Sequence, residues 1–272
     1  MKKTITTRIA AIAAVTSLMA GSQASEILYA QDYASGADNM ATVLSGDGHA
    51  VTSLLGGYNG ATDINNDLLG DLSAYDAVIW SASGPGFGGV HAAGQFDDLL
   101  TYVNGGGMVF VTGYDSIASP TDLPLAGFLG GSDSRDFGGS RDPLAITGAN
   151  SLSTGLFDIQ GVTPTGAWGD WDTLLGLGAD TECVAAANGG AAGACQWSLR
   201  SLGLGEIAYV SAGASGANTD TAWNDPANAY NNALRNFAFN AGTSAPAVPE
   251  PGTLGLLGAG LLGFALSRKK RA

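Results

Sequence analysis

Lysine is missing from the whole central part of this chain. The four lysines, Lys2, Lys3, Lys269 and Lys270, all lie at the two ends. Between residues 25 and 242 only four arginines oppose 23 acidic residues, which leaves a net charge of −19. Such a charge repels nucleic acid and anionic membrane surfaces and favours solubility. The sequence therefore predicts that nucleic acid is not a partner of this domain.

The first 24 residues have the composition of a secretory signal peptide. Lys2, Lys3 and Arg8 give a positive start, an apolar run follows at 9–20, and small residues end the segment at Ala24. The apolar run is shorter than the ~20 residues that a membrane-spanning helix needs. We therefore expect export by the general secretory route and removal of residues 1–24 by signal peptidase.

The last 25 residues combine a short motif, an apolar segment and a basic stop. The motif is Val248, Pro249, Glu250 and Pro251; the basic stop is Arg268, Lys269, Lys270 and Arg271. Between them, a helix over 253–267 would span ~22 Å, against a bilayer core of ~30 Å. Such a helix is a marginal anchor, but the basic residues would stay in the cytoplasm and halt translocation. This pattern predicts transient association with the membrane through a C-terminal helix.

The order of these three parts resembles a PEP-CTERM sorting signal. In that family an exosortase, a membrane protease-transferase of Gram-negative bacteria, processes the tail. The family's proteins are commonly tied to extracellular polysaccharide and biofilm matrix. The resemblance implies a protein held at the membrane before processing and then placed on the cell surface or in the extracellular matrix. The alternative is that the segment is an ordinary single-pass anchor.

Only two cysteines are present, Cys183 and Cys195, and export to an oxidising compartment favours a disulfide between them. The residues between them are rich in glycine and alanine, so the disulfide would close a hairpin or loop. Neither cysteine has a histidine nearby in the sequence, which argues against a catalytic thiol.

Apolar runs between residues 25 and 242 predict one α/β domain, followed by a linker and the sorting signal at 243–272. Strands are expected at 26–30, 49–55, 76–80 and 108–112, with helices at 40–44 and 96–103 between them. This alternation predicts a parallel sheet with right-handed crossovers. The second half of the domain is predicted to be richer in strands. There we expect strands at 143–147, 182–186, 196–199 and 206–211, and a final helix at 230–238.

Four segments in this order resemble the class I glutamine amidotransferase-like superfamily, including its ThuA-like branch. They are residues 72–80, 99–113, 142–156 and 203–211. The resemblance implies a flavodoxin-like parallel sheet flanked by helices. Active amidotransferases place a nucleophilic cysteine on the turn that follows the strand equivalent to 108–112. Tyr114 occupies that turn here, and no histidine follows it, so glutaminase activity is excluded.

Two other residues are candidates for acid–base catalysis. Asp115 and His91 are expected near the carboxyl ends of the parallel strands, where open α/β sheets bind ligands. The competing interpretation makes Asp115 a turn residue and His91 a surface or helix-start residue. The glycine-rich loop 83–89 lacks the lysine of a phosphate-binding loop, so we interpret it as a flexible connection.

One acidic segment partly matches a calcium-binding EF-hand loop. Residues 63–67 supply the first three ligand positions of an EF-hand loop, but Leu68 stands where glycine is required and Ala74 where a carboxylate is required. The segment is not an EF-hand. Irregular calcium sites stay open at two groups of acidic residues, namely Asp133, Asp136 and Asp142, or Asp220 and Asp225.

Three tryptophans lie in segments rich in glycine and aspartate: Trp168, Trp171 and Trp223. Exposed, they would stack on sugar rings; buried, they would anchor loops to the core. Two functions follow from the whole sequence. The first is an exported, non-catalytic envelope or matrix protein that binds glycan or another surface partner. The second is a ThuA-like carbohydrate-active hydrolase that uses Asp115 and His91.

Overall fold

A computed structural model describes residues 24–31, 39–55, 71–82, 91–94, 96–113, 116–117, 122–166, 170–211 and 220–244. Several predicted features lie outside these residues: almost all of the signal peptide, residues 63–67, the loop 83–89, Tyr114, Asp115, Trp168 and the sorting tail.

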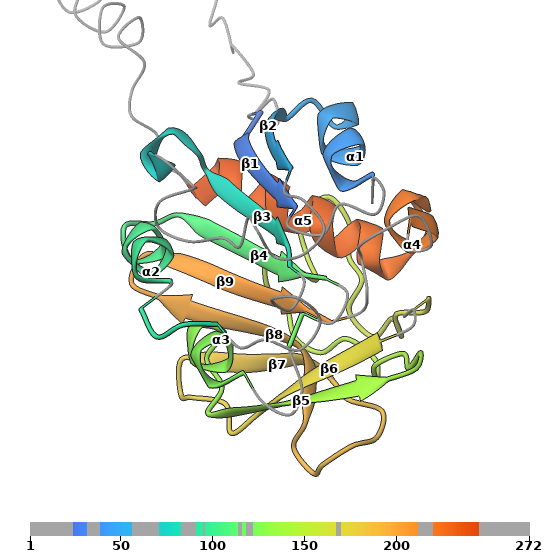
Figure 1. The fold of residues 1–272 in the computed structure, drawn as a ribbon. Helices are drawn as coiled ribbons and strands as arrows, with labels where there is room; N and C mark the ends of the chain where they lie inside the picture. The colour runs from blue at the N-terminus through green and yellow to red at the C-terminus, as the bar shows by residue number, and fades with distance from the viewer. Residues whose placement is uncertain are drawn as a thin grey trace, which may run out of the picture.

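Five strands form the parallel part of a single sheet (Figure 1). They are β1 (Glu26–Gln31), β2 (Ala50–Leu55), β3 (Ala77–Ser81), β4 (Met108–Thr112) and β9 (Gly205–Val210). Their order is β2-β1-β3-β4-β9, and each neighbouring pair is parallel. Every residue of β3 and β4 is buried, as expected for short apolar strands that are covered on both faces. The predicted parallel sheet is confirmed.

Helices cover both faces of this sheet, because side chains of a strand alternate between its two faces. One face packs against α1 (Met40–Gly46), α4 (Asp220–Asn224) and α5 (Ala229–Ser244), with Ile79 and Phe110 at its centre. The other face packs against α2 (Asp97–Asn104) and α3 (Leu123–Phe128), with Trp80 and Val111 at its centre. A single 3-10 turn, η1 (Leu72–Ala74), precedes β3. Among the described residues, no helix is both long enough and apolar enough to cross a bilayer.

The remaining strands extend the same sheet in antiparallel fashion. They are β5 (Asp133–Gly138), β6 (Asp170–Leu175), β7 (Thr181–Ala186) and β8 (Cys195–Leu202). β8 pairs with β9, β6 follows β8, and β5 forms the end of the path, while β7 pairs with β8. The β-rich second half is thus confirmed, including the expected strands at 182–186, 196–199 and 206–211.

The expected strand at 143–147 is wrong. This segment lies beside β7, and Leu144 and Thr147 donate backbone hydrogen bonds to Ala186 and Val184. A continuous ladder does not form, because Pro143 has no N–H and Ile146 donates instead to Val162. The segment is an irregular loop that follows the strand edge.

Trp171 and Trp223 are buried, which contradicts the alternative that they stack on sugar rings. Trp171 lies in β6, is 6% exposed and stacks on Phe137 with a centroid separation of 4.2 Å. Trp223 lies in α4, is 1% exposed and meets Phe110 edge-on at 6.0 Å. Both tryptophans therefore anchor the core.

A disulfide joins Cys183 of β7 to Cys195 of β8, as predicted. The two strands form an antiparallel hairpin, and the two Cα atoms lie 5.6 Å apart. The bond closes the loop that connects β7 to β8.

Replacing both cysteines by serine is expected to lower the free energy of unfolding by about 2–3 kcal/mol. A sequence separation of 12 residues closes a short loop, and the cross-link restricts the unfolded chain. Urea unfolding of the wild-type and double-serine proteins would measure the difference. As a control, adding reductant should destabilise the wild-type protein and leave the double-serine variant unchanged. A double-serine variant as stable as the oxidised protein would contradict the prediction.

Candidate functional site

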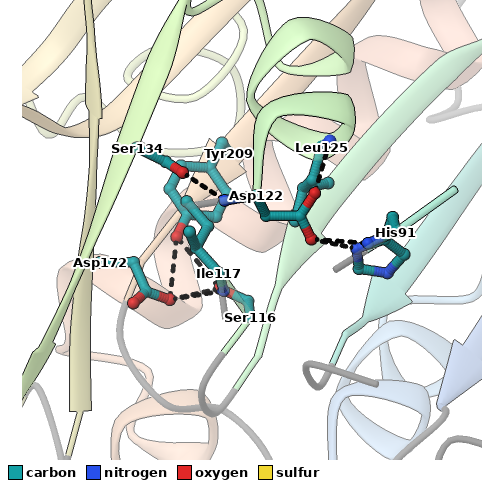
Figure 2. A network of polar contacts seen from close by, with 8 residues as sticks. All are labelled: His91, Ser116, Ile117, Asp122, Leu125, Ser134, Asp172 and Tyr209. Carbon is teal, nitrogen blue, oxygen red and sulfur yellow. Dashed lines mark hydrogen bonds and ion pairs between the residues drawn. The ribbon is translucent and has the colours of Figure 1, made fainter. Parts of the chain in front are cut away.

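His91 lies beyond the carboxyl end of β3 and is bound to Asp122 (Figure 2). The ring Nδ1 and Asp122 Oδ2 are 2.5 Å apart, and the backbone N–H of His91 donates to the same oxygen at 3.1 Å. Both side chains are fully buried. His91 is thus neither a surface residue nor part of α2, so that competing interpretation of His91 is wrong.

Asp122 connects three parts of the chain. Its Oδ1 accepts a hydrogen bond from the backbone N–H of Leu125 at 3.0 Å, which caps the N-terminus of α3. Its own N–H donates to Ser134 Oγ in β5 at 3.0 Å. Together with the contact to His91, these bonds hold α3, β5 and the segment before α2 in one arrangement.

Two aromatic side chains also lie against the His91 ring. Trp80 meets it edge-on with a centroid distance of 5.6 Å, and Phe96 lies 5.2 Å away. Within the described part of the chain, the ring Nε2 is buried and has no hydrogen-bond partner. His91 is therefore enclosed by core side chains. Because Asp115 lies outside the described residues, an acid–base pair between Asp115 and His91 stays a prediction.

A second buried network lies beyond the carboxyl end of β4 (Figure 2). Ser116 Oγ donates to Asp172 Oδ2 at 2.8 Å and lies 3.0 Å from the hydroxyl of Tyr209. The backbone N–H of Ile117 donates to the same carboxylate oxygen at 3.0 Å. The backbone N–H of Asp172 donates in turn to Ser211 Oγ at 2.7 Å. The network ties the segment after β4 to β6 and β9.

Sequence reasoning missed Asp122 and Asp172. For Asp122 a signal exists: an aspartate two residues before Pro124 is typical of a helix N-cap. For Asp172 the sequence offers little signal, because a carboxylate inside a strand is expected to face solvent. Its partners Ser116 and Tyr209 lie 56 and 37 residues away along the chain.

The pKa of Asp122 reflects opposing effects. Burial raises the pKa of this carboxyl. The hydrogen bond from His91, the charge of His91 and the backbone N–H groups of Leu125 and His91 lower it. The net result is a pKa below the ordinary value of 3.8.

Stability is therefore expected to fall in acid. A carboxyl whose pKa is lower in the folded than in the unfolded state stabilises the fold fully above its unfolded pKa, here 3.8, and this contribution is lost as the pH falls through the folded pKa. Urea unfolding of the wild-type protein and Asp122→Asn from about pH 6 to about pH 3 would test this. The stability gap between them should narrow below about pH 4. A constant gap across that range would contradict the prediction.

An open cavity of about 560 Å³ lies at the opposite, amino-terminal edge of the sheet. Its lining includes Asp76, immediately before β3, and residues 105–107, immediately before β4. Tyr75 and Tyr102 also line it, and Tyr102 donates its hydroxyl proton to the backbone carbonyl of Tyr75 at 3.1 Å. Burial raises the pKa of Tyr102 well above its ordinary value, so this hydroxyl stays protonated. We call this space the amino-edge cavity.

The structure shows the hydrogen-bond and ion-pair partners of several aspartates that were considered for calcium. Within the described residues, no cluster of three or more histidine, cysteine, aspartate or glutamate side chains could hold a metal ion. Asp133 forms an ion pair with Arg135 at 2.7 Å. Asp142 and Asp225 accept backbone hydrogen bonds, from Gly166 and Ala227 respectively, at 2.9 Å. These aspartates stabilise local loops and strands.

The C-terminal segment matches a known family model. Residues 247–270 match the PEP-CTERM protein-sorting motif, which confirms the resemblance. This motif implies processing by an exosortase and sorting to the cell surface. A search of curated proteins found no significant match.

Solved structures with a similar fold include ThuA-like proteins. One from Parabacteroides merdae is 14% identical, with a TM-score of 0.48 and coverage of 84% of this chain and 94% of its own. One from Bacteroides uniformis is 12% identical, with a TM-score of 0.47 and coverage of 82% and 93%. A cytoplasmic protein from Salmonella typhimurium is 14% identical, with a TM-score of 0.49 and coverage of 78% and 97%. Similarity at this level transfers no function.

Proposed function

We propose that the mature protein is a non-catalytic binding protein of the cell surface or extracellular matrix, and that its ligand is an extracellular polysaccharide. The PEP-CTERM motif supports the surface location. The strand order β2-β1-β3-β4-β9 supports a flavodoxin-like description of the scaffold. On this scaffold, the buried polar residues near the predicted catalytic crevice stabilise the fold.

The burial of the two polar networks carries this proposal. A general acid or base must come within ~2.6–3.2 Å of the atom it protonates or deprotonates, directly or through one water. The side chains of His91 and Asp122 have no exposed surface, and Ser116 and Asp172 are 0% and 1% exposed. Their hydrogen bonds join neighbouring elements of the protein. Such contacts are typical of structural networks.

The hydrolase alternative is less well supported. It requires Asp115 to meet His91 in an open crevice, whereas the His91 side chain is fully buried. The amino-edge cavity is lined in part by carboxylates, hydroxyls and tyrosine rings. These groups suit hydrogen bonding and stacking with sugars.

The test uses the processed protein purified from its native host. It is applied to an array of bacterial polysaccharides, and the released reducing ends are measured in parallel. We expect saturable retention on at least one polysaccharide with no release of reducing ends. Release of sugar at a rate that follows protein concentration would overturn the non-catalytic proposal. Absence of retention on every polysaccharide would overturn the binding role.

A further inference from the structure

Two tyrosines line the amino-edge cavity, and one of them, Tyr102, is held in place before any ligand arrives. Tyr102 projects from α2, and its hydroxyl is bound to the backbone carbonyl of Tyr75. The Tyr102 ring lies directly against Gly107, where a Cβ atom would collide with it. Glycine at 107 therefore lets the ring lie close to the backbone. Rigid aromatic walls reduce the entropy lost on binding.

Carboxylates and a hydroxyl supply the polar part of the cavity. Asp71 is oriented by Ser73, whose backbone N–H and Oγ both donate to Asp71 Oδ1. Asp76 is oriented by the backbone N–H of Glu26, which donates to Oδ2 at 2.9 Å. Asp98 and Thr101 lie on the first turns of α2. An ionised carboxylate accepts hydrogen bonds through two oxygens, which suits adjacent hydroxyl donors on a sugar ring.

The charge of the cavity excludes acidic ligands. Three carboxylates contribute to its lining, and none of the described lining residues is basic. The domain around it carries a net charge of −19 between residues 25 and 242. Phosphates and uronic acids would be repelled at this short range. A ligand without negative charge fits the site.

We propose that the amino-edge cavity binds a neutral sugar residue of an extracellular polysaccharide. Its volume of about 560 Å³ lies within the ~300–1,000 Å³ range of small-molecule sites. The tyrosine walls provide apolar surface, and the aspartates orient the hydroxyls. This inference rests on the proposed function, because it names the site and ligand class of the same binding role. The site lies at the edge of the sheet opposite to the predicted catalytic crevice.

Two adjacent aspartates provide a matched pair of variants. Asp97 and Asp98 are both exposed in the first turn of α2, so replacing either one removes the same charge from the same helix end. Only Asp98 lines the amino-edge cavity; Asp97 lines a different depression. Asp98→Ala should weaken binding about tenfold through loss of a charge-assisted hydrogen bond, and Asp97→Ala should change it less than about twofold.

A second variant fills the cavity. Thr101 is exposed on α2 and lines the space, so Thr101→Trp should occupy it at little cost to folding. Its binding is expected to fall by about a hundredfold or more. Each variant is measured in the full processed protein by calorimetric titration, with neutral hexose oligosaccharides and uronic acid oligosaccharides of the same length. Circular dichroism verifies folding; if Thr101→Trp does not fold, the aspartate pair decides.

The possible results test the binding site and the proposed function separately. Selective binding of neutral oligosaccharides that falls in Asp98→Ala and Thr101→Trp, but not in Asp97→Ala, supports the inference. Equal binding by all variants would overturn the site and leave the proposed function standing. Preference for uronic acids would overturn the ligand class. A wild-type protein that binds no glycan would overturn the proposed function together with this inference.

Discussion

Deletion of residues 248–272 is expected to move nearly all of the protein from the surface and matrix fractions into the soluble periplasmic fraction. The deleted part contains the PEP-CTERM motif, the apolar segment and the basic stop. Without it, a domain with a charge of −19 has no attraction to an anionic membrane. Cell fractionation followed by intact mass measurement tests this. We expect the intact mass of the wild-type protein to correspond to a chain that ends near Pro251.

Replacing Pro249, Glu250 and Pro251 by alanine distinguishes a sorting signal from an anchor. This variant keeps the apolar segment and the basic stop, so it still halts in the membrane. If the motif is needed for exosortase processing, the variant stays in the membrane fraction with residue 272 intact. A wild-type protein that itself ends at Ala272 in the membrane fraction would show that the tail is a plain anchor.

Asp122→Ala is expected to lower the free energy of unfolding by about 3–5 kcal/mol. The substitution leaves His91 buried without its partner, and the desolvation cost of that ring is no longer offset. It also removes the N-cap of α3, which contributes about 1 kcal/mol of that loss. Equilibrium unfolding in urea, followed by circular dichroism and tryptophan fluorescence, measures the change.

Asp133→Ala is the matched control for this prediction. Asp133 lies in β5, and its ion pair with Arg135 is partly exposed, so its removal should cost less than about 1 kcal/mol. The double variant His91→Phe and Asp122→Leu should be more stable than Asp122→Ala, because it leaves no unpaired buried polar group from the pair. A loss below about 1 kcal/mol in Asp122→Ala would contradict a structural role of the pair.

Binding measurements on the Asp122→Ala protein add a functional readout. If the pair is structural, each folded molecule should bind polysaccharide as tightly as the wild-type protein does. A variant that remains folded but loses binding would place the ligand in the crevice near His91.

Prediction from sequence succeeded where local patterns are strong. The strand expected at 108–112 agrees with β4 to the residue, and those at 26–30 and 76–80 agree with β1 and β3 within one residue at each end. Short apolar runs between turns specify buried strands, because burial on both faces allows few polar residues. The disulfide followed from the number of cysteines and the expected export.

Prediction failed where the elements are polar or very short. β5 contains Asp133, Arg135 and Asp136, so it shows none of the alternation that marks a strand. It forms because β6 offers a partner edge, and that edge is a product of the tertiary fold. α3 has six residues, and its stability comes from the Asp122 cap and from buried contacts of Leu125 and Phe128.

The sequence by itself determined the C-terminal sorting motif of this protein and the parallel half of its sheet. Both features lie in contiguous segments, namely the C-terminal motif and the apolar strands. Each segment can be recognised from residues that are neighbours along the chain. Only the tertiary structure decided which polar groups meet. It joined His91 to Asp122 across 31 residues and Ser116 to Asp172 across 56, and it formed the amino-edge cavity from η1, α2 and α5. Such contacts depend on sheet topology and burial, because residues distant in sequence become neighbours only when the core packs.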